Sequence, residues 1–268
     1  MKIIMIGHGM VGHKFIESVL EHVGDDVEIT ILAEEPRLAY DRVHLTEYFS
    51  GKSAKDLTLC RADFADAYGI DLRLNTKAVA IDQSHKTVTT NHGDVLSFDK
   101  LILATGSYAF VPPISGNDRE NCFVYRTIED LDAIRAASLN AKSGVVIGGG
   151  LLGLEAAKAL RDLNLETHVV EFAPRLMAVQ IDDLGGKVLR AKIENLGVKV
   201  HTQKATSSIE EGATTKHVMK FGDGSELETD IILFSAGIRP RDELARQSGL
   251  TLGERGGITI NDYCQTSN

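Results

Sequence analysis

The sequence predicts an α/β chain with two similar halves, and two repeated patterns support this prediction. A short apolar strand runs into a glycine turn and then an amphipathic helix at residues 2–23, and the same order returns at residues 145–163. Each half also closes on an apolar strand that ends in a small residue and a glycine, at residues 98–106 and 229–237. We therefore expect two copies of one α/β unit, each built on a parallel sheet.

The composition fits a protein of about two domains and excludes some partners. The chain has 268 residues, of which 43% are hydrophobic and 25% are charged, as in ordinary globular proteins. A net charge of −9 with scattered lysines argues against binding to nucleic acid or to an anionic membrane, and we expect no membrane span. The three cysteines are far apart, so we predict a cytoplasmic location and no metal site: Cys60, Cys122 and Cys264.

The first glycine turn has the spacing Gly7-x-Gly9-x-x-Gly12, which suits a dinucleotide. The first glycine makes the tight turn, the second lets the backbone approach a pyrophosphate, and the third lets the helix pack on the strand. Glu34 stands 22 positions after Gly12, near the ~20 expected for an acid that binds the ribose hydroxyls. The adjacent Glu35 competes for this role, and an exposed carboxylate at a strand end is the alternative.

The second glycine turn repeats this arrangement as Gly148-x-Gly150-x-x-Gly153. The next strand is expected at residues 167–170, and Glu171 follows it 18 positions after Gly153. A single turn of this kind is a weak signal, but two copies with matching strand ends predict two bound nucleotides.

Other segments give weaker signals. Arg42 lies in a loop at residues 36–49 and could meet a phosphate while Tyr40 covers a ring, although a solvated loop fits equally well. Backbone near Val79, in a strand expected at residues 77–82, could meet an adenine. Further elements are expected in the ranges 62–68, 71–74, 86–90, 95–98 and 182–195, with a hairpin turn at 222–224 between two strands and a helix near residue 244.

Taken together, these motifs resemble the flavoprotein reductases that carry FAD and a nicotinamide on two Rossmann-like domains. The resemblance implies an FAD domain at residues 1–111 plus 238–268 and an inserted NAD(P)H domain at residues 112–237. It implies FAD on Gly7, Gly9, Gly12, Glu34, Thr105 and Gly106, and NADH on Gly148, Gly150, Gly153 and Glu171.

Glu155 matches the family's acid near the nicotinamide, although a carboxylate in the first helical turn is also favoured by the helix dipole alone. NADPH is disfavoured because Glu171 would repel its 2′-phosphate. Hydride transfer between cofactors requires no side-chain acid or base, so no catalytic pair is assigned. The sequence lacks the cysteine pair of the disulfide reductases of this architecture.

Two phrases carry a finer resemblance, at residues 40–51 and 103–113. They are similar to the N-terminal flavin module of the NAD(P)H-dependent nitrite reductase large subunits. This resemblance implies that electrons pass from NADH through FAD to downstream iron–sulfur and sirohaem centres, where nitrite becomes ammonia. The family's third flavin motif and its cysteine-rich modules do not follow residues 262–267, so we expect a fragment.

Two alternatives remain open. One is a stand-alone reductase that serves a rubredoxin, a ferredoxin or another small electron-acceptor protein. The other is a nucleotide-binding module without turnover. Bound flavin in the purified protein separates the second alternative from the enzymes.

Overall fold

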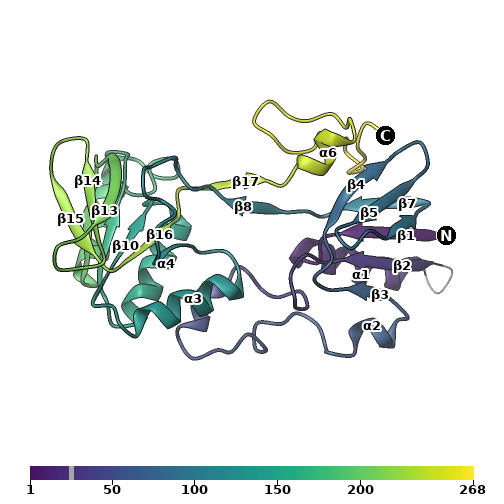
Figure 1. Ribbon diagram of the computed structural model, residues 1–268, viewed down its shortest axis with the longest axis horizontal. Coiled ribbons are helices and arrows are strands. Elements are labelled where there is room, and N and C mark those ends of the chain that lie inside the picture. Colours follow the sequence, from purple (N-terminus) through teal and green to yellow (C-terminus); the bar gives the residue numbers. More distant parts are fainter. Residues whose placement is uncertain (24–26) are drawn as a thin grey trace. The chain divides into compact units, whose positions relative to one another are not determined.

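The computed structural model describes residues 1–23 and 27–268, and the chain divides into two compact units (Figure 1). Unit 1 comprises Met1–Val43, Ala54–Tyr108 and Arg239–Asn268. Unit 2 comprises His44–Ser53 and Ala109–Ile238, so its sequence is inserted into that of unit 1. Both units contain a parallel sheet with helices, which confirms the predicted α/β class.

Unit 1 is built on a four-stranded parallel sheet in the order β3-β2-β1-β7. A three-stranded antiparallel sheet, β4-β5-β6, accompanies it. The elements are β1 (Lys2–Ile6), α1 (Met10–Val23), β2 (Glu28–Leu32), α2 (Phe64–Ala67), β3 (Asp71–Arg73), β4 (Ala78–Asp82), β5 (Thr87–Thr90), β6 (Val95–Ser97), β7 (Lys100–Leu103) and α6 (Glu243–Gln247).

The alternation of side chains along β1 puts one core on each face of this sheet. Met5 packs with Ile16 of α1 and Phe64 of α2 on one face. Ile4 and Ile6 pack on the other face, in a core that includes β4 and β5. Because successive residues of a strand point to opposite faces, the four consecutive apolar residues 3–6 are buried and serve both layers.

Unit 2 repeats this plan with a five-stranded parallel sheet in the order β12-β11-β10-β16-β9. A three-stranded antiparallel sheet, β13-β14-β15, again accompanies it. The elements are η2 (Leu45–Tyr48, a 3₁₀ helix), β9 (Cys122–Val124), α3 (Ile128–Ser138), β10 (Ser143–Ile147), α4 (Leu151–Asp162), β11 (Glu166–Val170), α5 (Asp183–Asn195), β12 (Val198–His201), β13 (Thr206–Glu211), β14 (His217–Phe221), β15 (Glu226–Thr229) and β16 (Ile231–Phe234).

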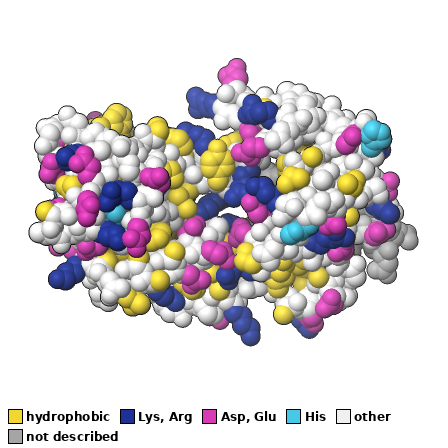
Figure 2. Space-filling model, in the orientation of Figure 1, with side chains coloured by type: hydrophobic (Ala, Val, Ile, Leu, Met, Phe, Trp, Pro, Cys, Tyr) yellow, Lys and Arg dark blue, Asp and Glu magenta, His cyan; other side chains and the backbone are white. Residues whose placement is uncertain are grey.

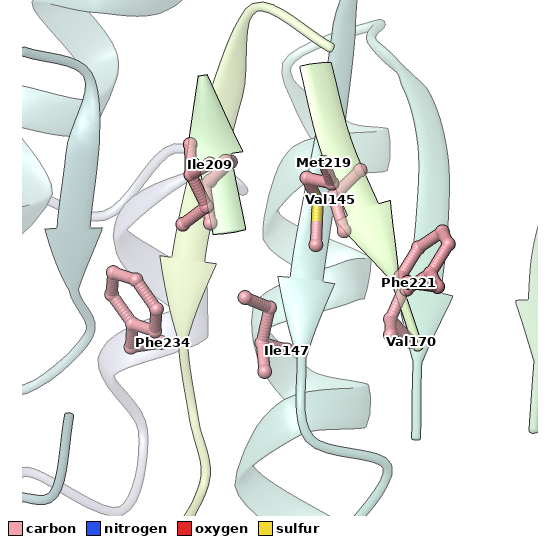
Figure 3. Close-up of a cluster of buried hydrophobic side chains, with 8 residues drawn as sticks. Val145, Ile147, Val170, Ile209, Met219, Phe221 and Phe234 are labelled. Carbon is pink, nitrogen blue, oxygen red and sulfur yellow. The ribbon is translucent and has the colours of Figure 1, made fainter. Parts of the chain in front are cut away.

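A hydrophobic core of unit 2 lies between its two sheets. Val145 and Ile147 of β10 face Ile209 of β13 and Met219 of β14, as Figure 3 shows. On the opposite face Gly144 leaves room for Leu160 of α4, because a Cβ there would come within 2.8 Å of that side chain. The glycine turn that follows β10 is thus held between packed layers.

Two of the four points at which the sequence passes from one unit to the other lie in β8 (Ser107–Ala109) and β17 (Ile238–Pro240), which pair as a two-stranded sheet. No helix in the described ranges 1–23 and 27–268 is long and apolar enough to cross a membrane. Basic and acidic side chains lie intermixed on the face drawn in Figure 2.

Several elements differ from the sequence-based expectation. The strands expected at 98–106 and 229–237 are shorter, as β7 and β16, because the backbone leaves each sheet where the glycine turn lies against it. Three antiparallel strands, β13 to β15, stand where two were predicted around the 222–224 turn. Helix α3 and strand β9 had no predicted counterpart.

Candidate functional site

The three glycines of the turn in unit 1 differ in what surrounds them. Gly7 has φ +104°, and a Cβ on it would overlap the carbonyl oxygen of Ala104 at the end of β7. A Cβ on Gly12 would lie 2.5 Å from the Gly7 oxygen. A Cβ on Gly9 would meet nothing within 4 Å. Packing therefore requires the first and third glycines, whereas the second borders open space.

The turn of unit 2 repeats this division. Gly148 has φ +120°, and a Cβ on it would overlap the Ser235 oxygen, while a Cβ on Gly153 would overlap the Gly148 oxygen. Gly150 again has nothing within 4 Å of the added atom, and it forms the N-cap of the twelve-residue α4. Open space next to the unpaired N–H groups at a helix start is the arrangement that admits a pyrophosphate.

Both turns lie where ligands bind in open α/β sheets. β1 lies between β2 and β7, and β10 lies between β11 and β16. In each unit the strand order therefore reverses at this strand, because the next strand along the chain lies on one side of it and a later strand lies on the other. The crevice outside the carboxyl ends at such a switch point is the general binding position. The structure thus places Gly9 and Gly150 at equivalent positions of two separate sheets.

Glu171, the expected ribose acid of unit 2, follows β11 and is held by backbone. Its Oε2 accepts a hydrogen bond from Gly149 N at 2.5 Å, and its Oε1 accepts one from Ala173 N at 2.7 Å. Each carboxylate oxygen keeps a further lone pair for a ribose hydroxyl.

Arg175, the nearby cation, is committed to its own loop. It donates to the carbonyl oxygens of Ile181 and Ala178 and pairs with Asp183 at 2.6 Å. These three partners draw the guanidinium into the loop that follows β11, which leaves it poorly placed to neutralise a 2′-phosphate.

Glu34 and Glu35, the two candidates for the ribose acid of unit 1, have different surroundings. Glu34 is exposed and forms ion pairs with Lys77, at 3.2 Å, and with Arg241. Glu35 accepts a hydrogen bond from the Tyr40 hydroxyl at 2.7 Å and pairs with Arg42. The Arg42 guanidinium lies 4.6 Å from the centre of the Tyr40 ring, which is only 3% exposed, so Tyr40 belongs to the core instead of presenting a free face.

Thr105 and Gly106 hold the segment that returns to unit 1. The Thr105 hydroxyl donates to the Arg241 carbonyl at 2.7 Å, and the Gly106 carbonyl accepts from Arg241 N at 3.0 Å. Val79 is the residue that the ladder between β4 and β5 skips, because Ala78 pairs with Thr90 and Ala80 with Thr89. Its backbone thus lies outside the regular ladder between these two strands.

Glu155 lies half-buried in the first part of α4, in the same unit as η2. Burial raises the pKa of its carboxyl, and the nearby His44 imidazole acts in the opposite direction. His44 was not singled out from the sequence, because the loop phrase gives no sign that residues 44–53 belong to unit 2.

His8, between Gly7 and Gly9, is buried and stacks on Phe64 with ring centres 6.4 Å apart. Within the described part of the chain neither of its ring nitrogens has a hydrogen-bond partner. Burial and the neighbouring His13 lower its pKa to about 4, so the imidazole is neutral at pH 7.

Comparison with known protein families assigns the whole chain to one family. The model of the pyridine nucleotide-disulphide oxidoreductases matches residues 1–268. The chain belongs to this family. It is an oxidoreductase module with two Rossmann-like units. Across the described residues, no cluster of three or more His, Cys, Asp or Glu side chains could hold a metal ion.

Among curated proteins, the chain is 54% identical over 268 residues to the nitrite reductase (NADH) large subunit of Escherichia coli (strain K12). It is 37% identical over 266 residues to a nitrite reductase [NAD(P)H] of Bacillus subtilis (strain 168). In both comparisons 99% of this chain is covered, but the chain spans only about a third of the relatives' length, 32% and 33%.

Among solved structures, the fold is similar to an NAD-dependent persulfide reductase from A. fulgidus, with a TM-score of 0.94 and 29% identity over 100% of this chain and 52% of that one. It is also similar to the water-forming NADH oxidase of Lactobacillus brevis bound to NADH, with a TM-score of 0.91 and 26% identity over 100% and 60%.

Proposed function

We propose that this chain binds FAD on unit 1 and NADH on unit 2, and that it passes electrons from NADH to the flavin. The observation that carries the proposal is the second glycine of each turn. Gly9 and Gly150 border open space, although the glycines around them are forced by packing. Open cradles of this kind occur twice, which supports two dinucleotides in one chain.

The residues that would hold these cofactors follow from the two turns. The N-terminal N–H groups of α1 and α4 would donate to the pyrophosphates, and Glu34 and Glu171 would accept from the ribose hydroxyls. Thr105, Gly106 and the backbone of Val79 would border FAD, and Glu155 the nicotinamide. When bound, FAD supplies the chemistry, because it accepts two electrons as a hydride and releases them singly.

The electron acceptor is inferred from the relatives. Proteins named nitrite reductases, two of them as large subunits, are 37–55% identical to the chain, so we propose that it serves nitrite reduction to ammonia through iron–sulfur and sirohaem centres in downstream modules. A small electron-acceptor protein is the second candidate, since a rubredoxin-NAD(+) reductase of Alcanivorax borkumensis is 28% identical over 267 residues. We assign the chain to the cytoplasm, given its scattered free cysteines.

The test is an anaerobic titration of the purified protein supplemented with FAD. NADH should bleach the visible absorbance of the protein-bound flavin, and the bleaching should saturate at the amount of bound FAD. Protein that binds FAD but is not bleached by NADH would favour a nucleotide-binding module without turnover. Failure to bind FAD at all would contradict the proposal.

We predict a preference for NADH over NADPH, because Glu171 can receive a ribose diol but repels a 2′-phosphate and Arg175 is engaged elsewhere. Glu171→Ala should reduce the difference in affinity between NADH and NADPH, because it should raise the dissociation constant for NADH more than that for NADPH. The measurement is the rate of flavin reduction against nucleotide concentration. Equal or faster use of NADPH by the unmutated protein would contradict the assignment.

A further inference from the structure

The carboxylate of Glu34 is held by two cations instead of by backbone. Arg241 contacts its Oε2 and Lys77 its Oε1. We propose that Arg241 is a positioning residue for FAD: its ion pair fixes the Glu34 carboxylate in the orientation that receives the adenosine ribose. This inference rests on the proposed binding of FAD to unit 1.

The need for such a residue follows from a difference between the two glycine turns. In unit 2 the position after the first glycine is Gly149, whose N–H holds Glu171. A Cβ on Gly149 would lie 3.0 Å from the Glu171 Oε2 and 3.1 Å from its Cβ, so a side chain there would displace the acid. In unit 1 the equivalent position is His8, which carries a buried imidazole. The carboxylate of Glu34 therefore needs a partner other than the glycine turn to fix its orientation.

Arg241 is suited to this task because its backbone is fixed on both sides of its Cα. Its N–H donates to the Gly106 carbonyl, and its own carbonyl accepts from the Thr105 hydroxyl. Thr105 and Gly106 follow β7, which pairs with β1. The backbone of Arg241 is therefore anchored at the edge of the predicted cofactor site, and its side chain extends from there. Lys77 has a flexible stem and a side chain that is 55% exposed, which makes it the looser of the two partners.

The ion pair leaves the carboxylate able to bind. A carboxylate has about four lone-pair positions, and one cation on each oxygen leaves a position on each for the two ribose hydroxyls. Because the Glu34 side chain is 46% exposed, the ion pair adds little to folding stability. Its effect is to remove rotamers of Glu34 that FAD would otherwise have to select, which raises affinity by pre-organisation.

The first experiment measures the dissociation constant of FAD from the apoprotein by quenching of flavin fluorescence. Arg241→Gln should weaken FAD binding about 3- to 10-fold, the range expected for ordering one long side chain. Arg246→Gln is the matched control, since it removes the same charge and an ion pair with Asp242 from the same segment. The control should leave FAD affinity unchanged, and Arg241→Lys should restore part of the loss. The thermal transition of each apoprotein, followed by circular dichroism, should stay within about 2 °C of the parent.

The second experiment separates positioning from a general disturbance of the site. An FAD analogue that lacks the 2′-hydroxyl of the adenosine ribose should bind the parent more weakly than FAD, and Arg241→Gln should reduce this difference. In a Glu34→Gln background, Arg241→Gln should have little further effect, because the carboxylate that it positions is gone.

Each result has a distinct meaning. Unchanged or tighter FAD binding by Arg241→Gln, or an equal loss in the Glu34→Gln background, would overturn the role of Arg241 and leave the proposed function standing. An unmutated protein that binds no FAD would overturn both.

Discussion

Glycines that look alike in the sequence serve different purposes in the structure. Gly148 and Gly153 leave no room for a Cβ because backbone oxygens lie where that atom would be, whereas Gly150 has open space. The backbone of Gly150, with φ −81° and ψ −177°, is one that any residue can adopt. Fold and ligand binding can therefore be separated by substitution within one turn.

Gly150→Ala should leave the fold intact and weaken the binding of NADH. The added methyl group meets no protein atom, so the free energy of unfolding should fall by less than about 1 kcal/mol, the loss expected at an N-cap. The same methyl group should occupy the approach of the pyrophosphate and raise the dissociation constant of NADH at least ~10-fold. Urea denaturation and NADH binding by fluorescence give the two quantities.

Gly153→Ala is the matched comparison. Its Cβ would overlap the backbone oxygen of Gly148, which cannot move away cheaply, so we expect a loss of about 2 kcal/mol in the free energy of unfolding. If Gly150→Ala proved the more destabilising of the two, the division of roles within the turn would be incorrect.

His8 makes stability depend on pH. In the folded protein its pKa is lowered from 6.5 to about 4 by burial and by His13, so the folded state stays unprotonated while the unfolded chain takes up a proton below pH 6.5. Stability should therefore fall as the pH falls from about 6.5 to 4, by about 3 kcal/mol from this residue. Burial shifts the pKa in the same direction for four further histidines: His13, His168, His201 and His217.

The pH dependence is measured by urea denaturation at pH 7 and pH 5. His8→Asn should reduce the loss of stability between the two conditions, because one neutral buried imidazole is removed. Ser138→Ala, which removes no titratable group, is the control and should keep the full pH dependence of the parent. A loss that is identical in the parent and in His8→Asn would show that His8 does not contribute.

At the scale of elements, the sequence predicted what local periodicity and turn chemistry encode. The strand, glycine turn and helix at residues 2–23 and 145–163 are present, as β1 with α1 and β10 with α4, because apolar spacing and glycine conformation are properties of short segments. Helix α3 was not predicted, although two local signals mark it. Thr127 and Asp130 form a capping box at its start. Its buried residues have helical spacing: Ile128, Leu131 and Ile134.

Contacts that join distant segments could not be predicted in this way. Arg241 pairs with Glu34 across 207 positions, and no local pattern marks it. The placement of residues 44–53 in unit 2 depends on the Ser50 hydroxyl bonded to Asp162 at 2.8 Å and on the Tyr48 carbonyl bonded to Arg135 at 2.5 Å. Each of these contacts requires the tertiary fold. The sequence therefore predicted the glycine turns and strand-end acids of the candidate site, but not the side chains that contact them.

The capping box of α3 gives a prediction at this scale. The Thr127 hydroxyl accepts from Asp130 N at 3.2 Å, and Asp130 accepts from Thr127 N at 2.8 Å. Thr127→Ala removes one half of this exchange and should lower the free energy of unfolding by about 1 kcal/mol. Ser138→Ala, at the other end of the helix, should change it by less than about 0.5 kcal/mol. Urea denaturation followed by circular dichroism compares the two, and equal effects would show that the cap adds nothing.

The whole molecule repeats one plan twice, with a parallel sheet between a helix and an antiparallel sheet in each unit. Two copies of one nucleotide-binding unit fit a reaction between two nucleotides, in which the protein supplies positioning and the cofactors supply the chemistry. A flavin delivers at most two electrons in a cycle, whereas reduction of nitrite to ammonia takes six. The intermediates of that reduction need a metal centre that can be recharged.

We predict that the 268-residue chain transfers electrons but does not reduce nitrite. Its three cysteines are free and far apart, and an iron–sulfur cluster needs about four thiolate ligands. With NADH and added FAD it should reduce ferricyanide or a dye slowly, at a rate proportional to bound FAD. Anaerobic incubation with NADH, FAD and nitrite, followed by an ammonia assay, should give no more ammonia than the control without protein. Ammonia above that control would show that nitrite chemistry needs no downstream module, and would overturn the division of labour proposed for the relatives' longer chains.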